Sequence, residues 1–462
     1  LLVAGPDSTL NRITTIWLPD GMNYTENILI SGTNRVGELW PGEFAPVNLS
    51  ILSGGKLTHP ATTSNAEYRV EIWVQSNLTV DGCSTIDVSG RGYLAGITIG
   101  NTNDGASTGY GGGSYGGLGY ASSGTVNPTY GTPQNPDDPG SGGGRVNAGG
   151  GLVRITAETI QLDGQIKANG AGSTYYGAGG SGGGVYLDCH QLSGTGSVSV
   201  VGGDGYSYDS LGGGGGGRIA IYHEGATSFN LSTGLVVTGG GPSGHTGGAG
   251  TAYNTNQVAP AWIQKTIPAG NVAGTYAYMD VKVGNPLQTA TFTADDVQIT
   301  GPTGPVAIQS LTQQSQFVFR IALVASIEAE GTYALTFGTN IWTVLGGHPV
   351  GVSTQLLVLD HTAPAAPVVT NYPGTPATNW LRTTAITLMG TREPSTAVWR
   401  DTTRLVTNGT GAWSAALTLT QGLNVVPLHA RDAAGNRSVT NTWLFQADTV
   451  APAVTAVVPA NS

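Results

Sequence analysis

The sequence is short of charge, of cysteine and of long apolar runs, and each shortage excludes a class of protein. Only 10% of the 462 residues are charged, and the net charge is −10. Because nucleic acids and anionic membranes attract clustered lysine and arginine, neither is an expected partner. The longest apolar stretches, such as FVFRIALVASI from Phe317, are too short to span a membrane. Two cysteines, Cys83 and Cys189, make no disulfide scaffold, although one bridge between them stays open.

Glycine is abundant instead, with 74 residues. Between residues 90 and 250 a pattern repeats in which a glycine run precedes a short alternating strand, a turn, and a second strand that ends in glycine. Ile155 to Leu187 and Ile166 to Val198 are both steps of 32 residues. A unit of this size cannot bury its apolar face alone and must stack on its neighbours. The repeat therefore predicts a parallel β-solenoid with glycine-rich coils.

We expect this solenoid to occupy residues 1–259, with an insertion at about 95–150 that has almost no apolar periodicity. Two interpretations of the insertion stay open. Its composition is typical of a flexible low-complexity loop. Against that, Tyr110, Tyr115 and Tyr120 recur every five residues and could pack their rings on an ordered, glycine-lined surface.

A run of six glycines, Gly212–Gly217, comes directly before the strand RIAIY. A flexible linker would not explain six consecutive glycines directly before a strand. Glycine is favoured where backbones must approach closely. We therefore expect this run to pack against another backbone and its amides to be protected from hydrogen exchange.

After the last glycine run, short strands recur with turn signals at the spacing of β-sandwiches. We expect two immunoglobulin-like sandwiches, over residues 260–359 and 360–447. The start of the second, Asp360-His-Thr-Ala-Pro, returns 88 residues later as Asp448-Thr-Val-Ala-Pro. Residues 448–462 are therefore expected to be either the first strand of a further domain or a strand donated to a neighbouring subunit.

Together these segments resemble very large, repeat-rich secreted or surface proteins of environmental bacteria, in which a glycine-rich parallel β-helix precedes bacterial immunoglobulin-like domains. The resemblance lies in VRITAETIQLDGQIKANG (153–170), GGGGGGRIAIY (212–222), DHTAPAAPVV (360–369) and GTGAWSAALTLTQGLNVVPLHARDAAGN (409–436). It implies a non-catalytic extracellular segment of a surface fibre, sheath or adhesin. Self-assembly or a longer tandem array would follow, with surface glycan as a further partner.

The alternative is a carbohydrate-binding or polysaccharide-cleaving β-helix module. Cleavage needs two carboxyl groups that converge at a fixed separation. The acids of the predicted solenoid do not recur at matching positions, so we expect isolated, solvated turn residues and no catalysis. These acids are Asp81, Asp87, Glu158, Asp163, Asp188, Asp204, Asp209 and Glu224. Cys189 and His190 are neighbours on an alternating strand and should point to opposite faces, which removes a thiol–imidazole pair.

Zinc motifs of the HExxH, HxH and Cys-x-x-Cys types do not occur in the sequence, and no other cofactor is indicated. The positions of four residues at the ends of the second sandwich indicate one candidate ion site. Asp432 and Asn436 end the second sandwich, Asp360 begins it, and Asp448 begins the segment after it. Calcium prefers such oxygen ligands, so the four residues predict a calcium site at the domain junction. The competing interpretation is that Asp432 and Asn436 only close a hairpin by bonding to the backbone.

Overall fold

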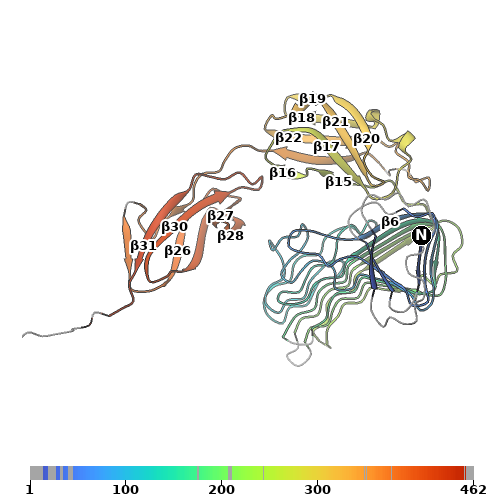
Figure 1. The fold of residues 1–462 in the computed structure, drawn as a ribbon, viewed down its shortest axis with the longest axis horizontal. Helices are drawn as coiled ribbons and strands as arrows, with labels where there is room; N and C mark the ends of the chain where they lie inside the picture. Colours follow the sequence, from blue (N-terminus) through green and yellow to red (C-terminus); the bar gives the residue numbers. More distant parts are fainter. Residues whose placement is uncertain are drawn as a thin grey trace, which may run out of the picture.

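The structure is a computed structural model that describes residues 14–18, 28–31, 35–39, 45–173, 176–206, 211–242, 244–347, 349, 351–375, 377–451 and 453. Strands dominate it (Figure 1), and helix is limited in these ranges to two short 3₁₀ turns, η1 (Thr289–Thr291) and η2 (Ala294–Asp296). The all-β prediction is confirmed. Within the predicted terminal segment 448–462, the alternating stretch AVTAVV (453–458) lies almost wholly outside the described residues.

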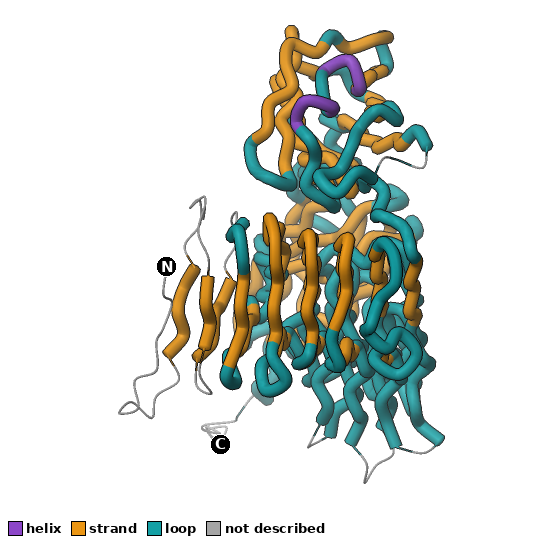
Figure 2. Tube along the Cα trace, turned by 90° about the vertical axis from the view of Figure 1, so that its right-hand side faces the viewer, coloured by secondary structure: helices purple, strands orange, loops and turns teal. Residues whose placement is uncertain are grey.

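The first part of the chain alternates between two sheets, each with seven described strands that run parallel (Figures 1 and 2). Consecutive strands belong to different sheets, so two strands make one coil, and the coils lie one upon another. We call residues 14–255 the coil stack. One sheet contains β1 (Thr14–Leu18), β3 (Arg35–Leu39), β5 (Lys56–Thr58), β7 (Thr85–Asp87), β9 (Gln165–Lys167), β11 (Ser197–Ser199) and β13 (Leu235–Val236). The other contains β14 (Thr251–Thr255), β12 (Arg218–His223), β10 (Gly184–Ser193), β8 (Leu152–Leu162), β6 (Val70–Val80), β4 (Leu49–Leu52) and β2 (Ile28–Ser31).

The strand register matches the repeat in the sequence. Leu187 pairs with Ile155 on one side and with Ile221 on the other, and Val198 pairs with Ile166. The predicted offsets are therefore confirmed. All five side chains are fully buried, because alternate residues of each strand point between the two sheets. Stacked β-branched and leucine side chains form one continuous core along the coil stack.

Glycine-rich segments extend from the coils as rods that are neither helix nor strand, drawn in teal at the lower right of Figure 2. We call them the glycine bundle; its rods include residues 112–117, 140–144, 148–151, 179–183, 200–205, 212–217, 238–241 and 247–250. Successive N–H groups of one rod donate to three neighbouring rods in turn. From Gly212 to Gly217 the acceptors are the carbonyls of Tyr110, His245, Gly203, Gly113, Gly248 and Val200. Because the donors return to the same neighbouring rod every third residue, each rod has the three-residue turn of a polyproline II-type helix. The rods are hydrogen-bonded to one another as in polyglycine II.

Close approach explains why the rods are glycine. A Cβ atom at Gly214 would lie 2.0 Å from the Gly180 carbonyl oxygen, and one at Gly217 would lie 2.0 Å from that of Gly183. The prediction that Gly212–Gly217 packs against other backbone is confirmed. The insertion takes part in this packing, since its Tyr115 is fully buried. Of the two interpretations of the insertion, ordered packing is the one observed.

Two β-sandwiches come after the coil stack. The first pairs the sheets β15-β17-β21-β20 and β16-β23-β22-β18-β19, and the second pairs β24-β26-β29 and β25-β31-β30-β27-β28. The first contains β15 (Ile263–Ile267), β16 (Gly270–Val272), β17 (Tyr276–Val283), β18 (Val297–Gly301), β19 (Gly304–Val306), β20 (Ile308–Gln313), β21 (Val318–Ile327), β22 (Gly331–Phe337) and β23 (Ser353–Leu359). The second contains β24 (Val368–Val369), β25 (Thr378–Leu381), β26 (Ala385–Thr391), β27 (Thr396–Arg400), β28 (Thr403–Gly409), β29 (Ala412–Thr418), β30 (Gly422–Arg431) and β31 (Asn441–Ala447). Each has its own apolar core, built around Phe319 and Phe337 in one and Phe445 in the other.

The first sandwich lies directly on the coil stack, where Lys282 of β17 meets Glu71 of β6 (Figure 1). The second lies farther from the coils and touches them through the β27–β28 hairpin, where the Arg404 guanidinium is 3.6 Å from the Asp104 carboxylate. Charged side chains are buried in the contact of the first sandwich, where Arg154 is 2% exposed and Asp188 0%, whereas Arg404 and Asp104 are 26% and 42% exposed. The contact between the coil stack and the first sandwich is therefore the candidate functional site.

Candidate functional site

The polar contact between the coil stack and the first sandwich begins with one row of side chains. Register places Glu71 of β6, Arg154 of β8 and Tyr186 of β10 side by side on the outer face of the sheet. Their sequence neighbours, such as Ile155, point inward to the core. Without a covering domain this row would be solvated. The first sandwich covers it, so we call these residues and their partners the junction.

Arg154 is the centre of the junction and is only 2% exposed. One guanidinium nitrogen, Nη2, donates to the Gly284 carbonyl of the sandwich at 2.9 Å. The other, Nη1, donates to the Pro136 carbonyl of the insertion at 2.5 Å. The guanidinium carbon lies 4.0 Å from the centre of the Tyr186 ring, a cation–π contact. A single arginine therefore joins three separate parts of the chain.

Glu71 and Lys282 form an ion pair across the junction, with Nζ and Oε2 2.7 Å apart. Burial alone would raise the pKa of Glu71, but the charges of Lys282, Arg69 and Arg154 hold it below its usual value. Burial lowers the pKa of Lys282 to about 8. Both groups are therefore charged at neutral pH, and each depends on the other because little water reaches either.

Asp188 was expected to be a solvated turn acid, and that prediction is wrong. It points outward from β10 but is 0% exposed, because the sandwich covers it. Asn285 Nδ2 donates to Asp188 Oδ2 at 2.6 Å and to the Tyr186 hydroxyl at 2.9 Å. Burial raises the pKa of Asp188 to about 6. Its carboxylate is an internal acceptor that holds a sandwich loop on the sheet.

The insertion supplies a further part of the junction, which sequence reasoning missed. Residues 130–138, here called the strap, lie across the outer face of the same strands. The Arg218 side chain donates to the Tyr130 carbonyl at 2.9 Å, and the Tyr222 hydroxyl donates to the Gln134 carbonyl at 3.0 Å. Asp137 accepts from Arg69 at 3.1 Å and from Gln264 of the sandwich at 2.6 Å. The strap thus joins coils and sandwich, and only its two adjacent aspartates, at 137 and 138, hinted at this in the sequence.

A second cluster forms at the edge of the junction, where Glu158, His190 and Glu224 lie in three successive coils. His190 Nδ1 is 2.8 Å from Glu158 Oε1, and Nε2 is 3.1 Å from the Leu345 carbonyl oxygen of the first sandwich. Nε2 also lies 3.6 Å from Glu224 Oε2. Since acceptors face both ring nitrogens, the doubly protonated ring satisfies the site best. Partial burial alone would lower the pKa of His190, but these acceptors raise it overall.

We expect the stabilisation from His190 to depend on pH. The folded-state pKa lies above the unfolded value of about 6.5, so its contribution is complete below pH 6.5 and is lost as pH rises through the folded-state pKa. His190→Gln should therefore lower the melting temperature most at pH 5.5 and least at pH 9. Thermal melts of both proteins across this range measure the difference. A penalty that is the same at every pH would contradict the protonated assignment.

The remaining coil acids bind neighbouring turns. Asp163 Oδ1 accepts from the Thr195 backbone N–H at 3.0 Å, and Asp81 Oδ2 accepts from that of Ser53. Both carboxyl pKa values are lowered. At Asp163 the bonds from Gln161 and Thr195 do this; at Asp81 burial alone would raise the pKa, but hydrogen bonds from Ser84, Ser53 and Cys83 together lower it. A general acid needs a raised pKa, so these two carboxylates suit a structural role. Val80 pairs with Leu162, so the residues that follow them, Asp81 and Asp163, occupy matching positions in successive coils. The prediction that no acids of the coils recur at matching positions is therefore wrong for this pair.

The other predicted groups lie apart from the junction. Cys189 is buried while the adjacent His190 is partly exposed, so they point to opposite faces as expected. Cys83 is exposed, and both cysteines are free. Asp87 binds Lys56 Nζ at 2.7 Å, and Asp204 accepts from the Gly241 N–H at 2.7 Å. Asp209 lies outside the described residues.

The four residues predicted to bind calcium do not share one place, so a single four-residue site is wrong. Asp432 comes just after the end of β30, whereas Asp448 accepts from Gln421, just before β30 begins. Ten residues of strand, about 30 Å, separate them. Among the described residues, no three acidic, histidine or cysteine side chains gather as a metal site.

The other three residues do meet. Asn436 Nδ2 donates to the Asp360 carbonyl at 2.7 Å and to Asp432 Oδ2 at 3.0 Å, and its backbone N–H donates to Asp432 Oδ1 at 2.9 Å. An amide donor thus lies between the oxygens that a cation would need. Calcium at these three residues stays a prediction, with hairpin closure as its competitor.

We expect Asn436→Ala to destabilise the second sandwich by about 1–2 kcal/mol, because two side-chain hydrogen bonds are lost. The loss should be the same in EDTA and in millimolar calcium if the amide holds the hairpin. Melting curves of the wild type and the variant in both buffers measure it. A calcium-dependent rise in melting temperature that disappears in Asn436→Ala would instead support an ion.

No family model and no curated protein matches the chain. Among solved structures, the N-terminal part of the bacterial S-layer protein SbsC is similar over 40% of this chain and 44% of its own, with 14% identity and a TM-score of 0.19. Fibronectin(III)-like modules of Clostridium thermocellum CbhA are similar over 39% of this chain and 89% of theirs, with 12% identity and a TM-score of 0.26. The chain thus spans less than half of the S-layer structure. Scores this low assign neither fold nor function.

The described residues include no helix that is both long and apolar enough to cross a membrane.

Proposed function

We propose that the chain is a non-catalytic structural segment of an extracellular bacterial surface protein, in which a two-sheet parallel β-solenoid with a glycine bundle is continued by immunoglobulin-like sandwiches. The junction is the observation that supports this role. Arg154 and Asp188 are buried and Lys282 is 12% exposed, and all three are bonded between domains. Groups of this kind in an enzyme would face a cleft; here they fix one domain to another.

A rigid connection is what a surface fibre or array requires. The strap and the junction together tie the first sandwich to the coils at several separate points. The second sandwich continues the chain away from the coils (Figure 1). The molecule therefore suits a load-bearing or spacing part, whose partners are further domains or further copies.

Carbohydrate binding is the second candidate, and the outer loops of the glycine bundle favour it. Tyr176 is 46% exposed, and its ring centre lies 5.6 Å from that of Tyr206. Nearby in the bundle, the Arg145 guanidinium lies 4.9 Å above the Tyr110 ring. Exposed aromatic rings give sugar rings a surface on which to stack.

One experiment separates the structural role from catalysis. The full chain is incubated with a panel of bacterial and plant polysaccharides, and released reducing ends are measured beside immunogold labelling of intact cells that produce it. We expect surface labelling and no release. Release that is lost in Asp163→Asn would overturn the proposal. Retention on a polysaccharide column without release would favour the carbohydrate-binding candidate.

A further inference from the structure

Where the chain leaves the first sandwich, hydrogen bonds tether it to three acceptor groups. The Asp360 N–H donates to the Val272 carbonyl at 3.0 Å. Asp360 Oδ1 accepts from the Thr362 N–H at 3.0 Å. The Glu330 carboxylate accepts from the His361 N–H at 2.7 Å and from the Thr362 hydroxyl at 3.0 Å. These bonds fix the direction in which the chain leaves the first sandwich.

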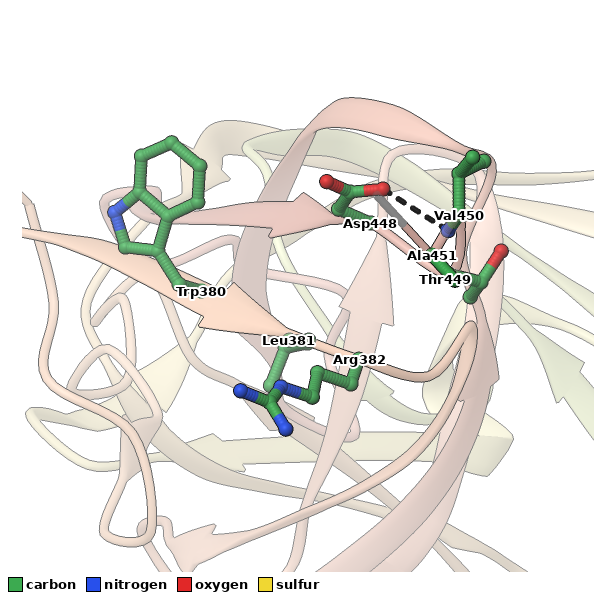
Figure 3. A pocket seen from close by; sticks show the side chains of 7 residues that line it. All are labelled: Trp380, Leu381, Arg382, Asp448, Thr449, Val450 and Ala451. Atoms are coloured by element: carbon green, nitrogen blue, oxygen red, sulfur yellow. Dashed lines mark hydrogen bonds between the residues drawn. The ribbon is translucent and has the colours of Figure 1, made fainter. Parts of the chain in front are cut away.

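Where the chain leaves the second sandwich, three corresponding acceptor groups tether it. The Asp448 N–H donates to the Leu381 carbonyl at 2.8 Å. Asp448 Oδ1 accepts from the Val450 N–H at 3.1 Å, the bond drawn in Figure 3. Gln421 takes the place of the glutamate and accepts from the Thr449 N–H at 3.2 Å and hydroxyl at 3.0 Å. The chain therefore leaves both sandwiches in the same local geometry.

The strands beneath the tethers match as well. β16 pairs in parallel with β23 in the first sandwich, and β25 pairs in parallel with β31 in the second. Val272 lies opposite Leu359, and Leu381 lies opposite Ala447, each one residue before the tethering aspartate. The two ends share one backbone arrangement, although Trp380 stands where the first end has Asn271, so what the backbone of one end binds indicates what the backbone of the other fits.

At the first end the following domain is in place. The hairpin Asp432–Asn436 of the second sandwich reaches back, and Asn436 Nδ2 donates to the Asp360 carbonyl at 2.7 Å. Glu393 of the same sandwich accepts from the Ala365 N–H at 2.8 Å. The second sandwich thus bonds to the segment that leaves the first at both Asp360 and Ala365.

At the second end, no residue within the described part of the chain donates to the Asp448 carbonyl. An open pocket lies beside it instead (Figure 3). Trp380 is 76% exposed there and Val450 is 70% exposed. The pocket is lined by Trp380, Leu381, Arg382, Asp448, Thr449, Val450 and Ala451, which together we call the seat.

We propose that the seat binds a further sandwich of the same type, joined directly after Ala451, whose Asp-x-x-Gly-Asn hairpin donates an asparagine amide to the Asp448 carbonyl. This inference rests on the proposed structural role and deepens it, since it specifies how one module holds the next. The seat would set the angle between successive sandwiches by a short bonded contact. A tandem array built in this way repeats one geometry every 88 residues.

The test is a full chain extended after Ala451 by a second copy of residues 364–462, which keeps the spacing of the two Asp-x-x-Ala-Pro starts. Cys83 and Cys189 are replaced by serine. Spin labels at Ser353 and Asn441, which stand at equivalent places in β23 and β31, report the angle between the first and second sandwiches. Labels at Asn441 and its counterpart in the added copy report the angle between the second and third.

We expect the two distance distributions to have the same mean and width. Replacing the counterpart of Asn436 in the added copy by alanine should broaden only the second distribution, and Asn436→Ala should broaden only the first. Asn408→Ala, at an exposed position on β28, is the matched control and should change neither. If the second distribution is broad and the alanine replacement in the added copy does not change it, the proposal for the seat is wrong. The proposed structural role would be unaffected. A separate melting transition checks that the added sandwich folds; if it does not fold behind the native seat, the proposal fails as well.

Discussion

Gly214→Ala is expected to disrupt the glycine bundle and to cost at least about 3 kcal/mol of stability. The new Cβ would lie 2.0 Å from the Gly180 carbonyl oxygen, and the atom it meets is backbone rather than a flexible side chain. The rods must then separate, which breaks the hydrogen bonds that Gly213 and Gly215 donate to other rods. Urea unfolding, together with hydrogen exchange of residues 179–183, measures both losses.

Gly82→Ala is the matched control in the same coil stack. A Cβ there would find its nearest atom, the Asp163 carbonyl oxygen, at 3.9 Å, an ordinary contact. Its free energy of unfolding should stay within about 0.5 kcal/mol of the wild type. Equal, small effects of both substitutions would mean that the rods are not packed at backbone distance.

Glu71→Ala is expected to have the other large effect, a loss of about 3–5 kcal/mol in the stability of the contact between coils and first sandwich. The substitution leaves the buried Arg154 and the largely covered Lys282 without the carboxylate they share. Lys282→Met should cost less, because Glu71 would keep Arg154 beside it. Thermal melting together with proteolysis of residues 256–262, which connect the two domains, measures the opening.

Glu328→Ala removes an exposed glutamate of the first sandwich and serves as the control. It should change the melting temperature little, since surface substitutions of this kind usually alter stability by about 0.5 kcal/mol or less. If Glu71→Ala behaves like Glu328→Ala, the junction is not what holds the domains together.

The coil register could be predicted because each coil repeats the same buried positions. Ile155, Leu187 and Ile221 mark one line of the core, and the spacing of 32 and 34 residues places them opposite one another. Similar spacing joins Glu158 to His190 and His190 to Glu224, so this cluster was accessible from sequence. The cluster shows only when the acids are aligned with the histidines, because alignment with apolar positions leaves Glu158 and Glu224 unrelated.

The junction could not be predicted in this way. Alternation shows that Asp188 points away from the coil core, but only the position of the first sandwich makes it buried. Glu71 and Lys282 are 211 residues apart and belong to different domains, so no local pattern connects them. Asp432 and Asp448 show the opposite failure, since they are close in sequence and an antiparallel hairpin places them at opposite ends of the sandwich.

Hydrogen exchange at Gly212–Gly217 in the full chain tests the central claim most directly, namely that the glycine runs form a bonded bundle fixed to the coil stack. All six N–H groups donate to neighbouring rods or loops, and all six residues are buried. Mass spectrometry of the peptide containing them should show exchange as slow as that of β10 and β12. These amides should exchange only when the coil stack itself unfolds. Exchange at the rate of an unstructured peptide, while β10 and β12 stay protected, would contradict it.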